Sequence, residues 1–159
     1  MPITETRGKI HDYLGMVIDF SHPGEVKFSM YGYILRLIQE LPPDMIGTST
    51  SPAASHLFQV QEPEDADLLD SDMADDFHHF TAKLLFLAKR TRPDIQTAVA
   101  YLCTRVKGPD TDDWKKLARV MMYLQDTPGL PLVISVNNSG NSSWCIDASY
   151  AIHNDMKSH

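Results

Sequence analysis

The chain has 159 residues, of which 43% are hydrophobic and 22% are charged, and these values fit a globular domain rather than a chain that is disordered throughout. The formal net charge of −7 argues against a general nucleic-acid-binding protein. No stretch comes near the roughly 20 uninterrupted apolar residues of a membrane span, and the N-terminus lacks the apolar segment of a secretion signal. We therefore expect a protein of the cytoplasm or nucleus without a membrane partner.

The charges are distributed unevenly along the chain. Eight of the 21 acidic residues lie between Glu62 and Asp76, whereas residues 77–136 carry nine Lys and Arg against five Asp and Glu. An acidic connector followed by a basic helical block describes this pattern better than the average charge does. Cys103 and Cys145 show no zinc-type spacing with the seven histidines, so we expect reduced cysteines and no structural zinc.

The first 42 residues predict a β-hairpin and a helix. Residues 13–20, "YLGMVIDF", are rich in strand formers, "SHPGE" is a Pro-Gly turn, and "VKFSM" at 26–30 alternates apolar and polar residues. Residues 31–41 then place apolar side chains at helical spacing until two prolines stop the helix.

Residues 43–76 predict one long connection, because they are first small and polar and then mostly acidic. A connection of this length is uncommon inside a compact domain. It is either a strap that lies on the surface or a mobile link, and the sequence leaves both open.

Residues 77–128 predict three amphipathic helices that pack into a small bundle. The third of them is expected to begin at an N-cap such as Thr111, after the break at Gly108-Pro109. The expected core stripes of the three helices are Phe77, Phe80, Leu84 and Leu87; Ile95, Val99, Leu102 and Val106; and Trp114, Leu117, Met121 and Leu124.

Residues 129–159 predict two strands, "LPLVISV" and "SWCIDASYAI", joined by the turn "NNSGNS". These two strands have an apolar face to bury, and no further element follows that could cover it. They therefore resemble the start of a sheet that is cut off. The fold class is therefore α+β: a β-hairpin, a helical bundle, and the first strands of a truncated sheet.

A basic corner joins the first two helices of the bundle. Lys89, Arg90 and Arg92 lie around a Thr-Arg-Pro step, beside the N-terminus of the next helix, which itself attracts anions. The corner is either a solvated turn or a contact for a phosphate backbone.

Three motifs resemble the polyproteins of copia-type retrotransposons: "LLFLAKRTRPDI", the helix "WKKLARVMMYL" with the "TPGL" step that follows it, and "WCIDASYAIHNDMKSH". The resemblance extends from about Tyr13 to His159. It implies the end of a reverse-transcriptase palm with the first thumb helix (1–42), a connector (43–76), the thumb bundle (77–128) and the start of a ribonuclease H domain (129–159).

The resemblance also implies roles for individual residues. The hairpin resembles the primer grip, with Leu14, Gly15 and Met16 at its working end, although residues alone also fit an ordinary edge hairpin. Asp147 matches the first metal-binding carboxylate of ribonuclease H, which implies Mg²⁺ in the intact enzyme. A capping or surface aspartate is the alternative for Asp147.

Catalysis by this chain alone is not expected. It has no Tyr-x-Asp-Asp motif, and the further carboxylates of a ribonuclease H site do not follow Asp147. We expect a fragment that binds an RNA/DNA template–primer duplex together with the remainder of the polyprotein. The alternative is a catalytically inert helical module that binds a protein partner or nucleic acid.

Overall fold

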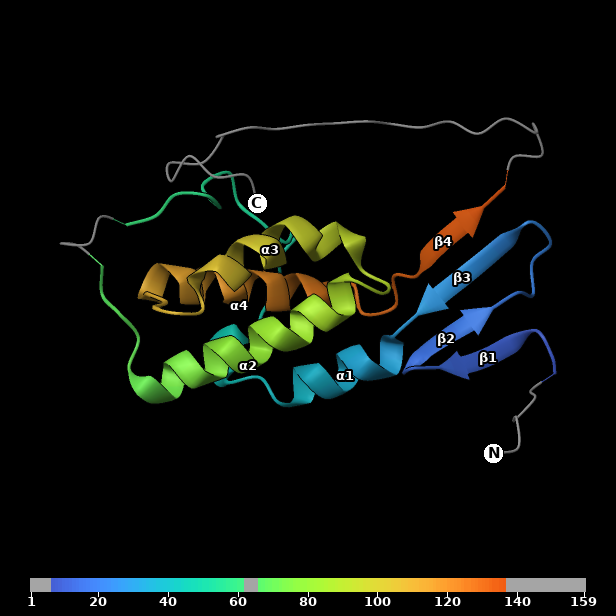
Figure 1. Cartoon of the computed structure of the whole chain (residues 1–159), viewed down its shortest axis with the longest axis horizontal. Coiled ribbons are helices and arrows are strands. Elements are labelled where there is room, and N and C mark those ends of the chain that lie inside the picture. The colour runs from blue at the N-terminus through green and yellow to red at the C-terminus, as the bar shows by residue number, and fades with distance from the viewer. Residues whose placement is uncertain (1–6, 62–65, 137–159) are drawn as a thin grey trace.

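The computed structural model describes residues 7–61 and 66–136. Within these ranges a four-stranded sheet stands beside a bundle of four α-helices (Figure 1), which confirms the α+β class. The elements are, in chain order, β1 Ile10–Tyr13, β2 Met16–Asp19, β3 Glu25–Ser29, α1 Tyr31–Gln39, α2 Ser71–Ala88, α3 Gln96–Arg105, α4 Thr111–Asp126 and β4 Leu132–Ser135. Short 3₁₀ turns cover Pro43–Met45 and Pro93–Ile95.

The predicted N-terminal strand is wrong in one respect, because it is two strands. Residues 13–20 are interrupted at Leu14 and Gly15, where β1 turns into β2, and Tyr13 pairs with Met16 across the turn. Leu14 has φ 50° and Gly15 has φ 79°, the left-handed pair that a two-residue hairpin turn requires. The predicted hairpin is therefore the second half of a three-stranded meander.

The strand predicted as the start of a separate sheet is in fact the fourth strand of the first one. β4 pairs with β3 in antiparallel orientation, with Phe28 opposite Leu132, so the sheet order is β1-β2-β3-β4. The second strand predicted after residue 140 lies outside the described residues. The chain thus returns from α4 to the meander, and residues 132–135 lie in the same sheet as residues 10–29 (Figure 1).

Carboxylate caps fix where two of the bundle helices begin. α2 begins at Ser71, not near Phe77, because the Asp70 carboxylate accepts the N–H of Met73 at 2.9 Å. The N-cap of α4 is Asp110 rather than the predicted Thr111. Asp110 accepts the N–H of Asp113 at 2.8 Å, and the Asp113 carboxylate accepts the N–H of Asp110 at 3.2 Å, which is a reciprocal capping box.

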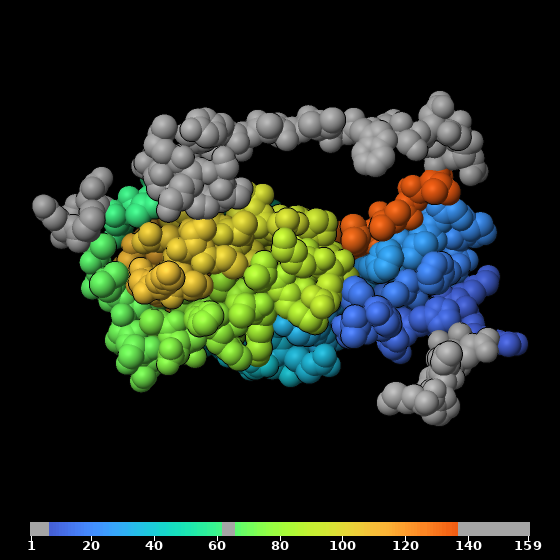
Figure 2. All heavy atoms as spheres, viewed as in Figure 1, coloured from blue at the N-terminus to red at the C-terminus, as the bar shows by residue number. Residues whose placement is uncertain are grey.

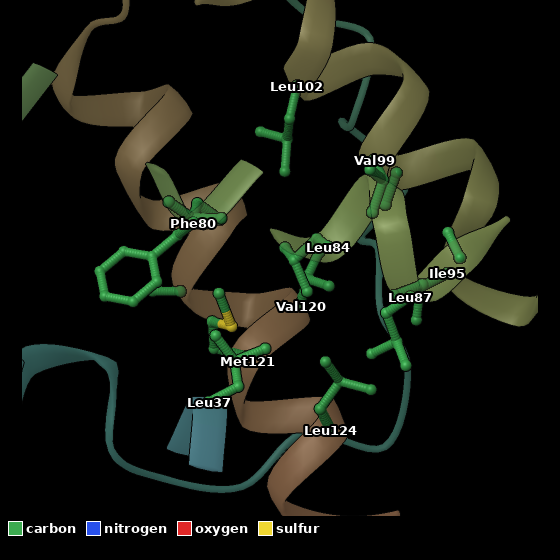
Figure 3. Packing of buried hydrophobic residues seen from close by; sticks show 14 of the residues in the cluster. Leu37, Phe80, Leu84, Leu87, Ile95, Val99, Leu102, Val120, Met121 and Leu124 are labelled. Carbon is green, nitrogen blue, oxygen red and sulfur yellow. The ribbon is translucent and has the colours of Figure 1, made fainter. Parts of the chain in front are cut away.

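The predicted apolar stripes form the core of the bundle. Figure 3 shows side chains from α2, α3 and α4 pointing toward one another, together with Leu37 of α1. All of the predicted stripe residues are buried except Val106, which is half-buried. Burial of each large side chain contributes about 1.5 to 3 kcal/mol, and the core residues of α1 to α4 form a single cluster.

The first part of the predicted connection lies on α4 as a strap. We call residues 43–61 the strap; it buries Met45 and Leu57 against the bundle. Trp114 donates its indole N–H to Asp44 at 2.6 Å, and the Gln125 amide donates to the carbonyl of Met45 at 2.8 Å. For these residues the surface strap, rather than the mobile link, is the correct alternative.

The sheet extends past one end of the bundle (Figure 2). Met30 is buried in the bundle core and Met16 packs against it, whereas much of the apolar surface of the sheet is exposed. Among the described helices, none is both long and apolar enough to cross a membrane.

Candidate nucleic-acid interface

Arg92, predicted to face solvent at the basic corner, lies in the interior. Its side chain is 1% exposed. The guanidinium donates to both carboxylate oxygens of Asp94, at 2.8 to 3.2 Å, and to the carbonyl and hydroxyl oxygens of Thr127 at 2.7 and 2.8 Å. Thr127 is the C-cap of α4, so Arg92 joins the start of the α3 region to the end of α4. Its donors are used inside the protein and are not available to a phosphate.

Asp94 lies at the surface edge of the bundle and forms an ion pair with Arg92. Burial raises the pKa of this carboxyl, but the hydrogen bonds and positive charge of Arg92 outweigh burial, and the pKa is lowered overall. The Tyr123 hydroxyl also donates to Asp94, at 2.9 Å. Asp94 therefore remains ionised at neutral pH and forms a stable pair with Arg92.

Lys89 and Arg90 remain at the surface, at the end of α2. Lys89 is exposed and makes no ion pair within residues 7–61 and 66–136. The guanidinium carbon of Arg90 lies 3.6 Å from the centroid of the Phe86 ring, and Nη1 donates to the carbonyl of Phe86 at 3.3 Å. Stacking on Phe86 restricts the Arg90 side chain and leaves the other guanidinium nitrogens for an acceptor.

Arg36 of α1 was missed by the sequence analysis. Tyr33 connects α1 to α2: its ring lies 5.5 Å from the Phe86 ring, and its hydroxyl donates to the carbonyl of Lys83 at 3.3 Å. Burial raises the pKa of Tyr33, and the charges of Arg90 and Arg36 both oppose this shift. Both guanidinium groups thus lie within electrostatic reach of one phenol.

Arg36, Lys89 and Arg90 together form what we call the α1–α2 cationic surface. α1 and α2 lie side by side in Figure 1. Lys83 lies between them but pairs with Glu40, which reduces its contribution. In sequence Arg36 stands more than 50 residues from Lys89, and only a prediction of the α1–α2 contact could have grouped them. The surface offers charges and two aromatic rings, which suit contact with a phosphate backbone.

The three residues predicted at the primer grip lie at the β1–β2 turn. Leu14 is 61% exposed at the tip. Gly15 follows it in the left-handed conformation, and a side chain there would be strained. Met16 packs against the bundle core, so a ligand at this turn would meet Leu14 and the backbone of Gly15 rather than Met16.

Asp147, the predicted magnesium ligand, lies outside the described residues. Within those residues no group of three or more His, Cys, Asp or Glu side chains could hold a metal ion. The Mg²⁺ prediction for the intact enzyme therefore stays a prediction.

Comparisons with known proteins give one informative similarity. The chain is 26% identical over 151 residues to the Saccharomyces cerevisiae protein "Putative transposon Ty5-1 protein YCL074W", and the alignment covers 94% of this chain. It covers 47% of the yeast protein, so the chain spans about half the length of that relative. No family model matches the chain, and no solved structure matches it. The chain is thus similar in sequence, over nearly its whole length, to a putative transposon protein.

Proposed function

We propose that the chain is a segment of a copia-type reverse transcriptase that runs from the primer-grip hairpin through the thumb into the start of ribonuclease H. Its function would be to hold the template–primer duplex. The similarity to a transposon protein over 94% of the chain carries this proposal. The order of elements, a β-meander followed by a helical bundle, agrees with the resemblance found in the sequence motifs.

The α1–α2 cationic surface is the proposed contact with the duplex. Arg90 is held in place by Phe86. Arg36, on the neighbouring helix, is exposed and adds a second guanidinium group near Tyr33. Arginine binds phosphate oxygens through paired N–H donors. Contacts of this kind position a duplex without reading its sequence, which is what a polymerase needs as it moves along a template.

In this proposal Arg92 stabilises the bundle and does not contact nucleic acid. Asp147 would be the first Mg²⁺ ligand of a ribonuclease H site that other carboxylates complete, and hard oxygen ligands suit this ion. We expect the chain by itself to show neither primer extension nor cleavage of an RNA–DNA hybrid. Cleavage that is lost in an Asp147→Asn variant would contradict this expectation.

Binding of a fluorescent RNA–DNA duplex tests the proposed function. Affinity should fall steeply between about 50 and 200 mM salt, because each phosphate contact releases counterions. Arg90→Gln should weaken binding about 10- to 100-fold, since a charge-assisted hydrogen bond contributes roughly 1.5 to 3 kcal/mol. The matched control is Lys107→Gln, which removes an exposed cation beyond the other end of α3. A flat salt profile would favour the alternative of an apolar protein-binding module.

A further inference from the structure

A pocket between the strap and α4 has no part in the proposed function. Its volume is about 370 Å³, within the range of small-molecule sites. One wall is apolar, and the residues that form it are Pro52, Ala53, Ala54, Leu57, Ala118 and Met122. Its polar groups come from α4 and the strap: Lys115, Lys116, Arg119, His56, Thr48, Ser49 and the carboxylates of Asp44 and Asp112.

The two carboxylates of the pocket already have partners. The Asp112 carboxylate pairs with the ammonium group of Lys116 at 2.8 Å, and Lys116 also donates to the carbonyl of Gln59 at 2.6 Å. Asp44 accepts the indole N–H of Trp114. Lys116 therefore neutralises Asp112, whereas Asp44 keeps its negative charge because an indole is neutral. Two cations, Lys115 and Arg119, stand against that one charge.

Lys115 and Arg119 are left without an anionic partner among the described residues. Arg119 donates from Nη2 to the Ser51 hydroxyl at 3.0 Å, which holds the guanidinium between α4 and the strap. Its Nε is buried and has no acceptor in the described part of the chain. A ligand could meet only the other nitrogens of the guanidinium, since Nε is closed off, and an anion there would supply the negative charge that Arg119 lacks.

We propose that this pocket binds a small phosphate monoester with an apolar or aromatic body, of the class of nucleoside monophosphates. The phosphate meets Arg119 and Lys115, because guanidinium and ammonium groups are the usual phosphate partners in proteins. The body of the molecule lies on the apolar wall between the strap and α4. This site is separate from the α1–α2 cationic surface and does not depend on the proposed duplex binding.

Calorimetric titration of the full chain with adenosine monophosphate, inorganic phosphate and adenosine tests the proposal. The monophosphate should bind more tightly than either part alone. Equal affinity for inorganic phosphate would overturn the role of the apolar wall, and equal affinity for adenosine would overturn the role of the two cations. No binding at millimolar adenosine monophosphate would overturn the site itself.

Substitutions connect the binding to named residues. Arg119→Gln should weaken the binding of adenosine monophosphate about 10- to 100-fold, which is the equivalent of a lost charge-assisted hydrogen bond. Lys115→Gln, at an exposed side chain, should also weaken it and carries the test if Arg119→Gln does not fold by circular dichroism. Lys107→Gln is the control and should bind as the wild type does. Equal losses of affinity in all three variants would overturn the assignment of the phosphate to Arg119 and Lys115. Unchanged affinity in both Arg119→Gln and Lys115→Gln would overturn it as well. Duplex affinity should stay unchanged in the Lys115→Gln variant.

Discussion

Substitution of Arg92 by alanine separates a structural role of the basic corner from a nucleic-acid role. The change removes an ion pair with Asp94 and two hydrogen bonds to Thr127. It leaves a carboxylate without its cation, and the Thr127 carbonyl keeps only the N–H of Leu130, at 3.3 Å. We expect a large loss of stability and no direct loss of duplex contacts.

The structure sets the size of this loss. Removing one partner of a fully buried ion pair costs about 3 to 5 kcal/mol of unfolding free energy. The side chain of Asp94 is 29% exposed and keeps the Tyr123 hydroxyl as a donor, so water and Tyr123 offset part of the cost. We therefore expect about 3 kcal/mol, which is a large share of the roughly 5 to 15 kcal/mol that stabilises a domain.

Urea denaturation followed by circular dichroism measures this loss. With a dependence of about 2 kcal/mol per molar urea, the midpoint should fall by roughly 1.5 M in Arg92→Ala. Arg92→Lys keeps the charge but cannot bridge Asp94 and both Thr127 oxygens, so its midpoint should lie between those of the alanine variant and the wild type. Lys89→Ala, at an exposed side chain, should change stability by less than about 0.5 kcal/mol. An unchanged midpoint in Arg92→Ala, together with weaker duplex binding, would refute the buried role of Arg92.

Three further predictions concern the cap of α4, the β1–β2 turn and the loss of stability at low pH. Asp110→Ala should lower the unfolding free energy by about 2 kcal/mol, because it removes a helix cap that is also buried, and a midpoint within error of the wild type would contradict the capping box. Leu14→Gly should raise the unfolding free energy by up to about 1 kcal/mol, and with it the melting temperature, because it removes a leucine in the left-handed conformation from an exposed turn. A lower melting temperature would show that the leucine side chain contributes packing. The folded-state pKa of Asp94 is lowered, so the carboxylate stabilises the protein above its unfolded pKa near 4, and this contribution is lost as pH falls through the folded value. Asp94→Asn should therefore lose less stability than the wild type between pH 5 and pH 2, and equal losses would contradict the pairing.

The helices of the bundle could be predicted from the sequence because their apolar residues recur at the period of a helix. Phe77, Leu87, Leu117 and Leu124 occupy the core positions that this period assigns to them. The start of α2 was placed too late, because the acidic residues before Phe77 resemble a linker. Four of them, from Asp70 to Asp76, are in fact the N-cap and first turns of a helix, where carboxylates are favourable.

The partners of strands and charges could not be predicted in the same way. The residue types at 132–135 predict a strand. Nothing in the neighbouring sequence indicates that this strand pairs with β3, which lies more than 100 residues earlier. Similarly, the sequence shows three cations near Pro93, but the burial of Arg92 depends on Thr127, which lies 35 residues away. Arg36 was missed for the same reason, since only the packing of α1 on α2 brings it and Arg90 near the same phenol, that of Tyr33.

The salt dependence of duplex binding tests the account most directly. The logarithm of the binding constant for an RNA–DNA duplex should be measured against the logarithm of the salt concentration. It should be measured for the wild type and for the combined Arg36→Gln, Lys89→Gln, Arg90→Gln variant. Each lost phosphate contact flattens this slope by about 0.9 on B-form DNA, so removal of the α1–α2 cationic surface should flatten it by roughly 2 to 3. A variant that folds as the wild type does and keeps the wild-type slope would contradict the proposal that this surface holds the duplex.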